Sequence, residues 1–118
     1  MSLKLSVKSV NGVTIVYCSG RIVFGEEAAE LRERVKEMLA TERQIVLNLG
    51  GVSYIDSGGL GTLVGLYTSA RSANGDVKLA NLTQRVRDQL QITKLVTVFE
   101  VFDSEDKAIA SFPARATA

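Results

Sequence analysis

Alternating apolar and polar residues open the chain and predict a β-hairpin. From residue 3 to residue 8 every second side chain is apolar, and Asn11-Gly12 marks a tight turn. A second strand, rich in β-branched residues, follows over residues 13–18 and closes at Gly20. Cys18 lies inside this strand, where we expect a small buried side chain with no redox role.

Helical periodicity alternates with short apolar runs along the rest of the chain. The helices are expected at residues 26–40, 58–70, 83–91 and 104–112, and the strands at residues 44–49, 77–80 and 98–102. The unbroken apolar run at 44–49 is typical of a strand that is buried on both faces between parallel neighbours. We therefore predict one α/β domain over residues 1–113, with a mixed, mostly parallel sheet and about four helices, followed by a short flexible tail at 114–118.

The composition excludes several classes of function. The chain has 118 residues, 14 Lys and Arg against 13 Asp and Glu, one cysteine and no histidine. The near-neutral charge leaves no general footprint for nucleic acid or for an anionic membrane. Without histidine, Ser-His-Asp and Cys-His catalysis lack their base and the common zinc sites lack ligands, and one cysteine makes no intrachain disulfide. We expect a protein without a cofactor or a metal.

Targeting signals are not expected in this sequence. Residues 1–10 alternate in polarity and carry no long apolar core, so we expect no signal peptide. A bilayer-spanning run of roughly 18 apolar residues is also missing from the sequence. We expect a cytoplasmic protein that neither inserts into a membrane nor binds nucleic acid directly.

One segment departs from the even spread of charge along the chain. Between Arg43 and Arg71 the only charged residue is Asp56, and six of the ten glycines lie in the same window. The segment reads NLGGVSYIDSGGLGTLVGLYTS. It places Asp56-Ser57 between a buried strand with its loop and the start of a helix.

This junction has properties that suit an anion. Ser57 is expected where the first N–H groups of a helix point outward, so its hydroxyl is a candidate cap and a phosphate on it would be favoured by the helix dipole. Gly58, Gly61 and Gly65 follow at i, i+3 and i+7, which suggests that another backbone or a protein surface approaches closely there. Spacing alone leaves open that Asp56-Ser57 is a plain helix cap and that Gly58-Gly59 is a tight turn.

A nucleotide-binding loop fits the segment poorly. After Gly59 and Gly61, the third glycine of a G-x-G-x-x-G pattern comes one position late, at Gly65, and no Lys-Ser or Lys-Thr pair follows. The end of the next strand carries Leu79-Ala80-Asn81 where an acidic residue would be needed.

The segment IVLNLGGVSYIDSGGLGTLVGLYTSAR resembles the signature of the STAS domain, a family shared by anti-sigma factor antagonists and the tails of sulphate transporters. The usual form is an apolar strand, a D-S-[S/T]-G-L-G turn and a helix. The resemblance covers nearly the whole chain, because Gly20-Arg21-Ile22 and the strand at residues 77–82 match the steps before the first long helix and the third helix. It implies a STAS-like single domain.

The resemblance also implies a phosphorylation switch. In free-standing members the serine directly after the motif aspartate is phosphorylated, which corresponds to Ser57 beside Asp56. The implied partner is an anti-sigma factor serine kinase with a histidine-kinase-like ATPase fold. The unphosphorylated antagonist sequesters this kinase and releases a sigma factor, and a PP2C-type phosphatase resets the switch. Gly58 stands where the family more often has Ser or Thr, so that neighbouring hydroxyl is lost here.

We expect the partner to bind the serine turn together with a basic stretch at residues 71–94. The expected partner-binding residues are Asp56, Ser57, Gly58, Gly59, Gly61, Thr62, Gly65, Arg85 and Arg87. Positive charges on residues 71–94 would speed the encounter with an acidic partner. A solvent-exposed helix surface explains these charges equally well.

Other functions remain open from the sequence. The main alternative is a STAS-type structural subunit of a lipid-transport ATPase complex, and another is a scaffold in a stress-sensing assembly. An enzyme fits least, because Asp56 has no second carboxylate nearby in the sequence to share acid–base work.

Overall fold

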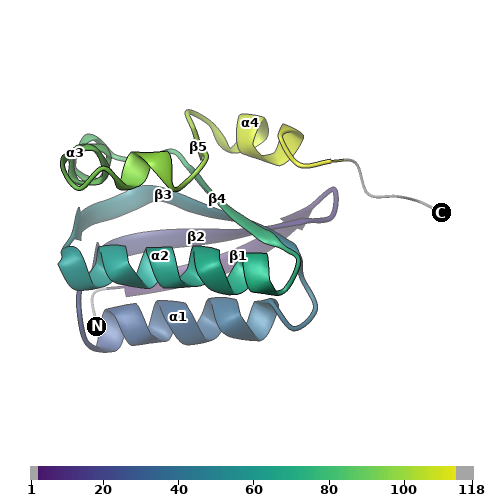
Figure 1. Cartoon of the computed structure of the whole chain (residues 1–118), viewed down its shortest axis with the longest axis horizontal. Helices are drawn as coiled ribbons and strands as arrows, with labels where there is room; N and C mark the ends of the chain where they lie inside the picture. Colours follow the sequence, from purple (N-terminus) through teal and green to yellow (C-terminus); the bar gives the residue numbers. More distant parts are fainter. Residues whose placement is uncertain (1–2, 114–118) are drawn as a thin grey trace.

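A five-stranded sheet organises the chain (Figure 1). The computed structural model describes residues 3–113. The strands lie side by side in chain order: β1 (Leu3–Val10), β2 (Val13–Ile22), β3 (Gln44–Ile55), β4 (Asp76–Ala80) and β5 (Val101–Phe102). The helices are α1 (Glu26–Met38), α2 (Ser57–Ser72), α3 (Gln84–Ile92) and α4 (Glu105–Ala110), with a short 3-10 turn, η1 (Leu95–Thr97), after α3. The tail predicted at residues 114–118 lies outside the described residues.

The pairing of the strands confirms the predicted mixed sheet. Strands β1 and β2 are antiparallel and join at Asn11-Gly12, where both residues have a positive φ, as a tight hairpin turn requires. The pairs β2–β3, β3–β4 and β4–β5 are all parallel. Parallel strands bring their carboxyl ends to one edge of the sheet, so the loops that follow β2 and β3 meet there.

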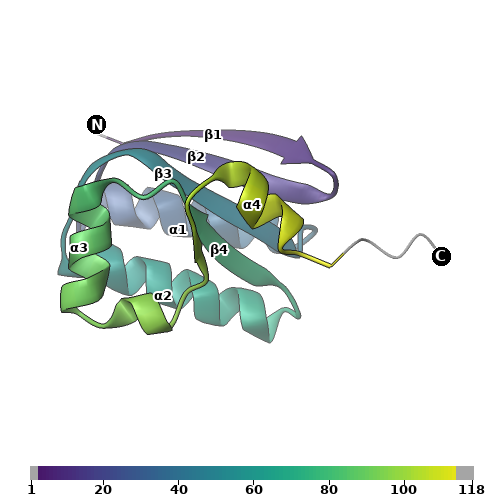
Figure 2. The same ribbon diagram turned by 90° about the horizontal axis from the view of Figure 1, so that it is seen from above.

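Helices cover both faces of the sheet, with α1 and α2 on one side and α4 on the other (Figures 1 and 2). The larger core lies under α1 and α2, and α3 contributes Val86 and Leu90 to it. A smaller core on the opposite face includes Ala108 of α4 and Phe112, packed on side chains of β2 and β3. Within residues 3–113, no helix is long and apolar enough to cross a membrane.

Strand β3 runs further than the sequence predicted. The expected strand ended at residue 49, whereas pairing with β2 continues to Ile55. The register between β2 and β3 shifts twice, and Gly51 lies at the first shift, where an added Cβ would come within 3.1 Å of the Cys18 carbonyl oxygen. The glycines therefore admit bulges that let the strand continue, where we had expected a loop.

The last strand is shorter than predicted. Of the expected residues 98–102, only Val101 and Phe102 pair with β4. The chain before them forms η1, and Leu95 and Val98 pack against the larger core. Their spacing of three residues matches one turn of a 3-10 helix, so this apolar run serves packing more than strand pairing.

The interior position of Cys18 is confirmed. The side chain is buried within β2, and this burial raises the pKa of the thiol to about 12. A thiol with so high a pKa stays protonated at neutral pH and is a poor nucleophile.

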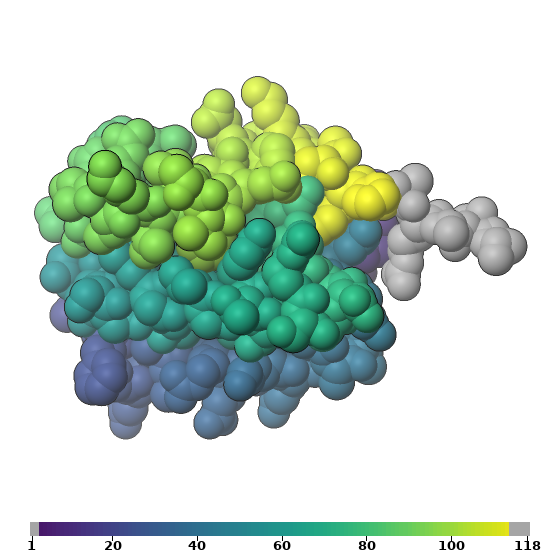
Figure 3. All heavy atoms as spheres, viewed as in Figure 1, coloured from purple at the N-terminus to yellow at the C-terminus, as the bar shows by residue number. Residues whose placement is uncertain are grey.

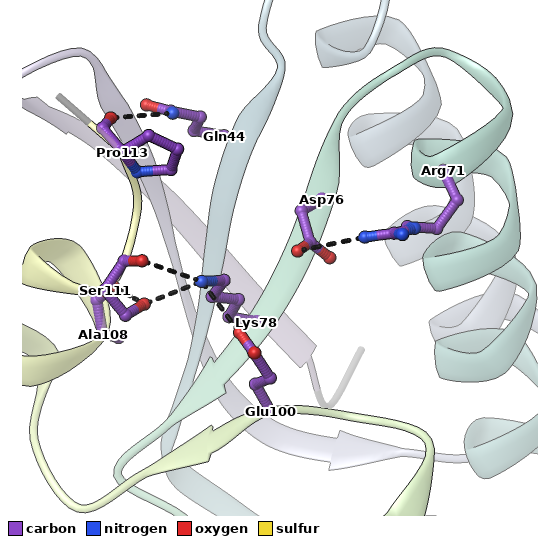
Figure 4. A network of polar contacts seen from close by, with 8 residues as sticks. All are labelled: Gln44, Arg71, Asp76, Lys78, Glu100, Ala108, Ser111 and Pro113. Atoms are coloured by element: carbon purple, nitrogen blue, oxygen red, sulfur yellow. Dashed lines mark hydrogen bonds and ion pairs between the residues drawn. The ribbon is translucent and has the colours of Figure 1, made fainter. Parts of the chain in front are cut away.

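A buried lysine holds the end of α4 against the sheet (Figure 4). The Nζ atom of Lys78 donates to Ser111 Oγ at 2.8 Å and to the Ser111 carbonyl oxygen at 3.3 Å, and it lies 2.8 Å from a carboxylate oxygen of Glu100. The same atom sits 4.3 Å from the centroid of the Phe112 ring. Because Lys78 is almost fully buried, these contacts replace the water that its ammonium group has lost.

We expect Lys78→Ala to lower the free energy of unfolding by roughly 2–3 kcal/mol, because it removes both the packed stem and the hydrogen bonds to Ser111. Urea denaturation followed by circular dichroism measures the change. The matched control is Lys107→Ala on exposed α4 surface, for which we expect a change within about 0.5 kcal/mol. Equal losses in the two variants would contradict a special role for Lys78.

Candidate functional site

The sequence motif forms the junction between β3 and α2. Asp56 is the N-cap residue of α2, with an extended backbone, and Ser57 is the first residue of the helix. The loop from β2 to α1 lies beside this junction, because the Asp56 N–H donates to the Ile22 carbonyl oxygen at 3.3 Å. Figure 3 shows α2 on the molecular surface between α1 on one side and the later part of the chain on the other.

The carboxylate of Asp56 binds backbone groups from two segments. Its Oδ1 accepts the N–H of Gly59 at 2.8 Å, and both of its oxygens lie 3.1 Å from the N–H of Phe24. Asp56 therefore caps α2 and ties the β2–α1 loop to it. The expectation that the Ser57 hydroxyl caps the helix is wrong, since the aspartate one residue earlier occupies that role.

The side chain of Ser57 is exposed at the start of α2. Within the described part of the chain, its hydroxyl has no hydrogen-bond partner. The first N–H groups of a helix have no acceptor inside the helix, and the N-terminal end carries partial positive charge. An accessible hydroxyl therefore stands where negative charge is favoured.

Gly58 and Gly59 allow the β2–α1 loop to approach α2. A Cβ on Gly58 would lie 2.6 Å from the Cβ of Phe24, and one on Gly59 would clash with the Ile22 carbonyl oxygen. Both glycines are helical, so the alternative of a tight turn at Gly58-Gly59 is wrong. The predicted close backbone approach is confirmed at Gly58, and Gly59, for which it was not predicted, has an even closer neighbour.

Gly61 and Gly65 instead face an open groove. A Cβ on either residue would have no neighbour within 4 Å. The groove has a volume of about 470 Å³ and runs between α1 and α2. Its small-residue walls are formed by Gly25, Ala28, Ala29, Gly58, Gly61, Thr62 and Gly65, with Phe24 and Arg32 also lining it. The groove is therefore not filled by other side chains next to Gly61 and Gly65.

Two residues near Ser57 have surroundings that the sequence did not indicate, while the partner contact predicted for Thr62 stays a prediction. Thr62, expected to contact a partner, is buried and its hydroxyl donates to the Gly58 carbonyl oxygen at 3.0 Å. Phe24, which the sequence analysis did not single out, is 81% exposed and lies directly against Gly58. The only sequence signal for Phe24 is an aromatic residue before Gly25, outside the periodicity of either neighbouring element.

The two arginines expected to bind a partner point to different neighbours. The guanidinium of Arg87 lies 3.7 Å from a carboxylate oxygen of Asp103, at the β5 side of α3. The guanidinium of Arg85 lies over the ring of Tyr54, 5.8 Å from its centroid. Tyr54 is two residues before Asp56 in β3, so Arg85 belongs to the edge of the sheet that carries Ser57, and the structure does not bring Arg87 there.

Residues 4–108 match the STAS domain family. This chain belongs to the STAS domain family. It is 30% identical over 111 residues to BtrV of Bordetella bronchiseptica, a candidate anti-sigma factor antagonist. This alignment covers 93% of this chain and 95% of BtrV. It is also 30% identical over 102 residues to the anti-sigma-B factor antagonist of Bacillus subtilis, covering 86% of this chain and 92% of that protein.

Solved STAS structures share the fold. A candidate anti-sigma factor antagonist from Thermotoga maritima aligns with a TM-score of 0.83 at 25% identity, covering 90% of this chain and 92% of that one. SpoIIAA of Bacillus aligns in its phosphorylated form with a TM-score of 0.69 at 18% identity, covering 92% and 97% of the two chains. Its unphosphorylated form gives 0.73 at 19% identity, covering 92% and 93%.

In this STAS domain, Asp56 and Ser57 are expected to differ in their contribution to stability. We expect Asp56→Ala to lower the free energy of unfolding by about 2 kcal/mol, because backbone N–H groups in the loop and in α2 lose their acceptor. We expect Ser57→Ala to change it by less than about 0.5 kcal/mol, because the exposed hydroxyl makes no contact that is lost. Thermal unfolding of both variants measures the difference, and a larger loss for Ser57→Ala would overturn this assignment.

Proposed function

We propose that this STAS domain is an anti-sigma factor antagonist, and that phosphorylation of Ser57 switches its binding to an anti-sigma factor. The observation that carries the proposal is the exposed hydroxyl of Ser57, which has no hydrogen-bond partner within residues 3–113 and lies at the start of α2, directly after the motif aspartate. Curated relatives over nearly the full chain bear the names of such antagonists, which supports the same role here.

The proposed partner is an anti-sigma factor that is also a serine kinase, with a histidine-kinase-like ATPase fold. The unphosphorylated domain sequesters this kinase in the cytoplasm, and a sigma factor is released. Phosphorylation of Ser57 ends the sequestration, and a PP2C-type phosphatase restores it. The domain itself binds and does not catalyse, because the carboxylate of Asp56, the only charged residue in the motif, is engaged with the backbone of Phe24 and Gly59.

The fold can carry a phosphate at this position. Phosphorylation adds about −1.5 to −2 charge at neutral pH. At Ser57 this charge would stand at the N-terminus of a 16-residue helix, where the dipole and the first N–H groups favour an anion. The neighbouring Asp56 carboxylate already accepts backbone hydrogen bonds, which offsets part of its repulsion. SpoIIAA, which shares the fold, has been solved in both phosphorylated and unphosphorylated forms.

The same phosphate would oppose docking. In a complex it would lose water at the interface and face the partner beside a second negative group, Asp56. Every ~1.4 kcal/mol of lost binding free energy weakens the affinity tenfold. A charge change at one residue is therefore enough to release the partner without a change of fold.

The surface around Ser57 offers both an anchor and a recess for the partner. Phe24 is exposed against the first turn of α2, and exposed aromatic residues are frequent binding hot spots. The groove along Gly61 and Gly65 is open and lined by small residues, so it can receive partner side chains.

Other hydroxyl groups in the segment are less available for phosphorylation. Thr62 is buried and bonded to the Gly58 carbonyl oxygen. Ser53 is exposed, but its hydroxyl donates to the Gly20 carbonyl oxygen at 3.3 Å. Ser57 is therefore the acceptor that the local geometry favours.

We expect Ser57→Asp to weaken binding to the cognate serine kinase by roughly a hundredfold, with its melting temperature nearly unchanged, because it adds charge at the interface and not in the core. Titration calorimetry with purified kinases from the same genome measures the affinity. The control Ser57→Ala should bind but accept no phosphate when incubated with kinase and ATP.

Undiminished affinity of Ser57→Asp would refute the proposed switch. Mass spectrometry that places the phosphate on Thr62 or Ser53 would overturn the site. If no serine kinase binds and the chain instead purifies with the ATPase of a lipid transporter, the structural-subunit function replaces the one proposed.

The groove can be tested by filling it. We expect Gly61→Leu to weaken kinase binding at least tenfold, because its side chain would occupy space that the partner needs. The matched control is Gly61→Ala, which should bind nearly as well. Its free energy of unfolding should be about 0.5–1 kcal/mol higher, because alanine has a higher helix propensity than glycine. Equal binding by Gly61→Leu would exclude the groove from the interface.

A further inference from the structure

Two arginines from different elements lie against one tyrosine ring at the carboxyl edge of the sheet. The guanidinium carbon of Arg21, at the end of β2, is 5.9 Å from the centroid of the Tyr54 ring. That of Arg85, in the first turn of α3, is 5.8 Å from the same centroid. We call Arg21, Tyr54 and Arg85 the arginine patch.

The arginine patch carries charge that the described part of the chain does not neutralise. Arg21 and Arg85 are exposed and form no ion pair within residues 3–113. By contrast, Arg71 also stacks on a tyrosine ring but pairs with Asp76, and Arg87 pairs with Asp103. Two like charges gathered on one ring repel each other, and a bound anion would relieve that repulsion.

The patch is continuous with the proposed docking surface. Arg21 pairs with Tyr54 in the β2–β3 register, and the next pair, Ile22 with Ile55, leads directly into the Asp56 junction. On the α3 side, the Gln89 amide donates to the Ile55 carbonyl oxygen at 3.4 Å. The patch and Ser57 therefore share one edge of the molecule.

The exposed face of α3 extends the patch with an apolar group. Arg85, Asp88, Gln89 and Ile92 line a shallow depression of about 370 Å³, and Ile92 is 75% exposed. Asp88 is the acidic group within this depression, and its carboxylate accepts a hydrogen bond from Gln84 at 2.7 Å. An exposed apolar side chain that shares a depression with an arginine is a composition typical of protein interfaces.

We propose that the arginine patch binds carboxylates of an acidic segment on the protein partner that docks at Ser57. This inference rests on the proposed function. Guanidinium groups match carboxylates in a planar fork, and stacking on Tyr54 restrains both arginines before the partner arrives, which lowers the entropy cost of binding. Charge complementarity of this kind acts mainly on the rate of association and on the choice of partner.

A protein carboxylate is favoured over a nucleic acid as the occupant. A nucleic acid presents a row of phosphates, and proteins that bind it spread many Lys and Arg residues along one face. The patch offers two guanidinium groups that form no ion pair with the described residues, in a chain with a net charge of +1. Two localised charges fit one or two carboxylates on a partner surface.

The test measures association and dissociation of the cognate serine kinase by stopped-flow at several salt concentrations. We expect Arg21→Gln/Arg85→Gln to lower the association rate constant roughly tenfold at low salt and to flatten its salt dependence. Arg21→Lys/Arg85→Lys should recover most of the association rate, since the charge returns, but should dissociate faster because the planar fork is missing.

The matched control is Lys8→Gln/Lys107→Gln, which removes the same number of positive charges from exposed positions on β1 and α4, outside the expected partner-binding residues. We expect its association rate to change less than about twofold. Circular dichroism and thermal unfolding of every variant separate binding effects from misfolding. If the two double variants lower the association rate constant equally, the effect comes from the net charge and not from the arginine patch, and the inference is overturned.

The outcomes also separate this inference from the proposed function. If wild-type protein binds the kinase and Arg21→Gln/Arg85→Gln binds it with unchanged kinetics, the patch is refuted while the phosphorylation switch stands. If wild-type protein binds no serine kinase, both are refuted. Binding of wild-type protein to a labelled 20-nucleotide duplex or to phosphatidylserine vesicles, lost in the same double variant, would assign the patch to a polyanion and overturn the acidic protein segment.

Discussion

The hydrogen bonds between the Asp56 carboxylate and backbone N–H groups organise the edge of this domain that carries Ser57. They start α2 at Ser57 and hold the β2–α1 loop against the first turn of that helix. The same contact holds Phe24 beside Gly58, and Phe24 and Gly25 line one part of the groove between α1 and α2. The close approach in turn requires that positions 58 and 59 carry no side chain.

This arrangement divides two roles between adjacent residues. The carboxylate of Asp56 is directed inward, to the backbone of its own chain, whereas the hydroxyl of Ser57 is directed to solvent. Chemistry at Ser57 can therefore change the electrostatics of the surface while the contacts that define the fold stay in place. In the proposed switch, the phosphorylated and unphosphorylated states therefore need not differ in stability or shape.

The sheet topology decides which charges share that edge. Parallel pairing of β2 with β3 sets Arg21 beside Tyr54, and α3 brings Arg85 over the same ring. Arg87, two residues later on α3, lies on another side of the helix and meets Asp103. A basic stretch that is uniform in the sequence thus becomes two surfaces, one with free guanidinium groups and one already neutralised.

Local patterns in the sequence determined the order of strands and helices, the antiparallel start of the sheet, the burial of Cys18 and the position of the Asp56-Ser57 junction. These features depend on periodicity and turn chemistry within a few residues, so they can be predicted without a structure. The length of β3, the exposure of Phe24, the hydrogen bond from the Phe24 N–H to Asp56 and the placement of Arg21 and Arg85 on Tyr54 were decided by the tertiary structure alone. Each of these depends on bulges and on contacts between segments far apart in the chain, whose distances no local pattern encodes.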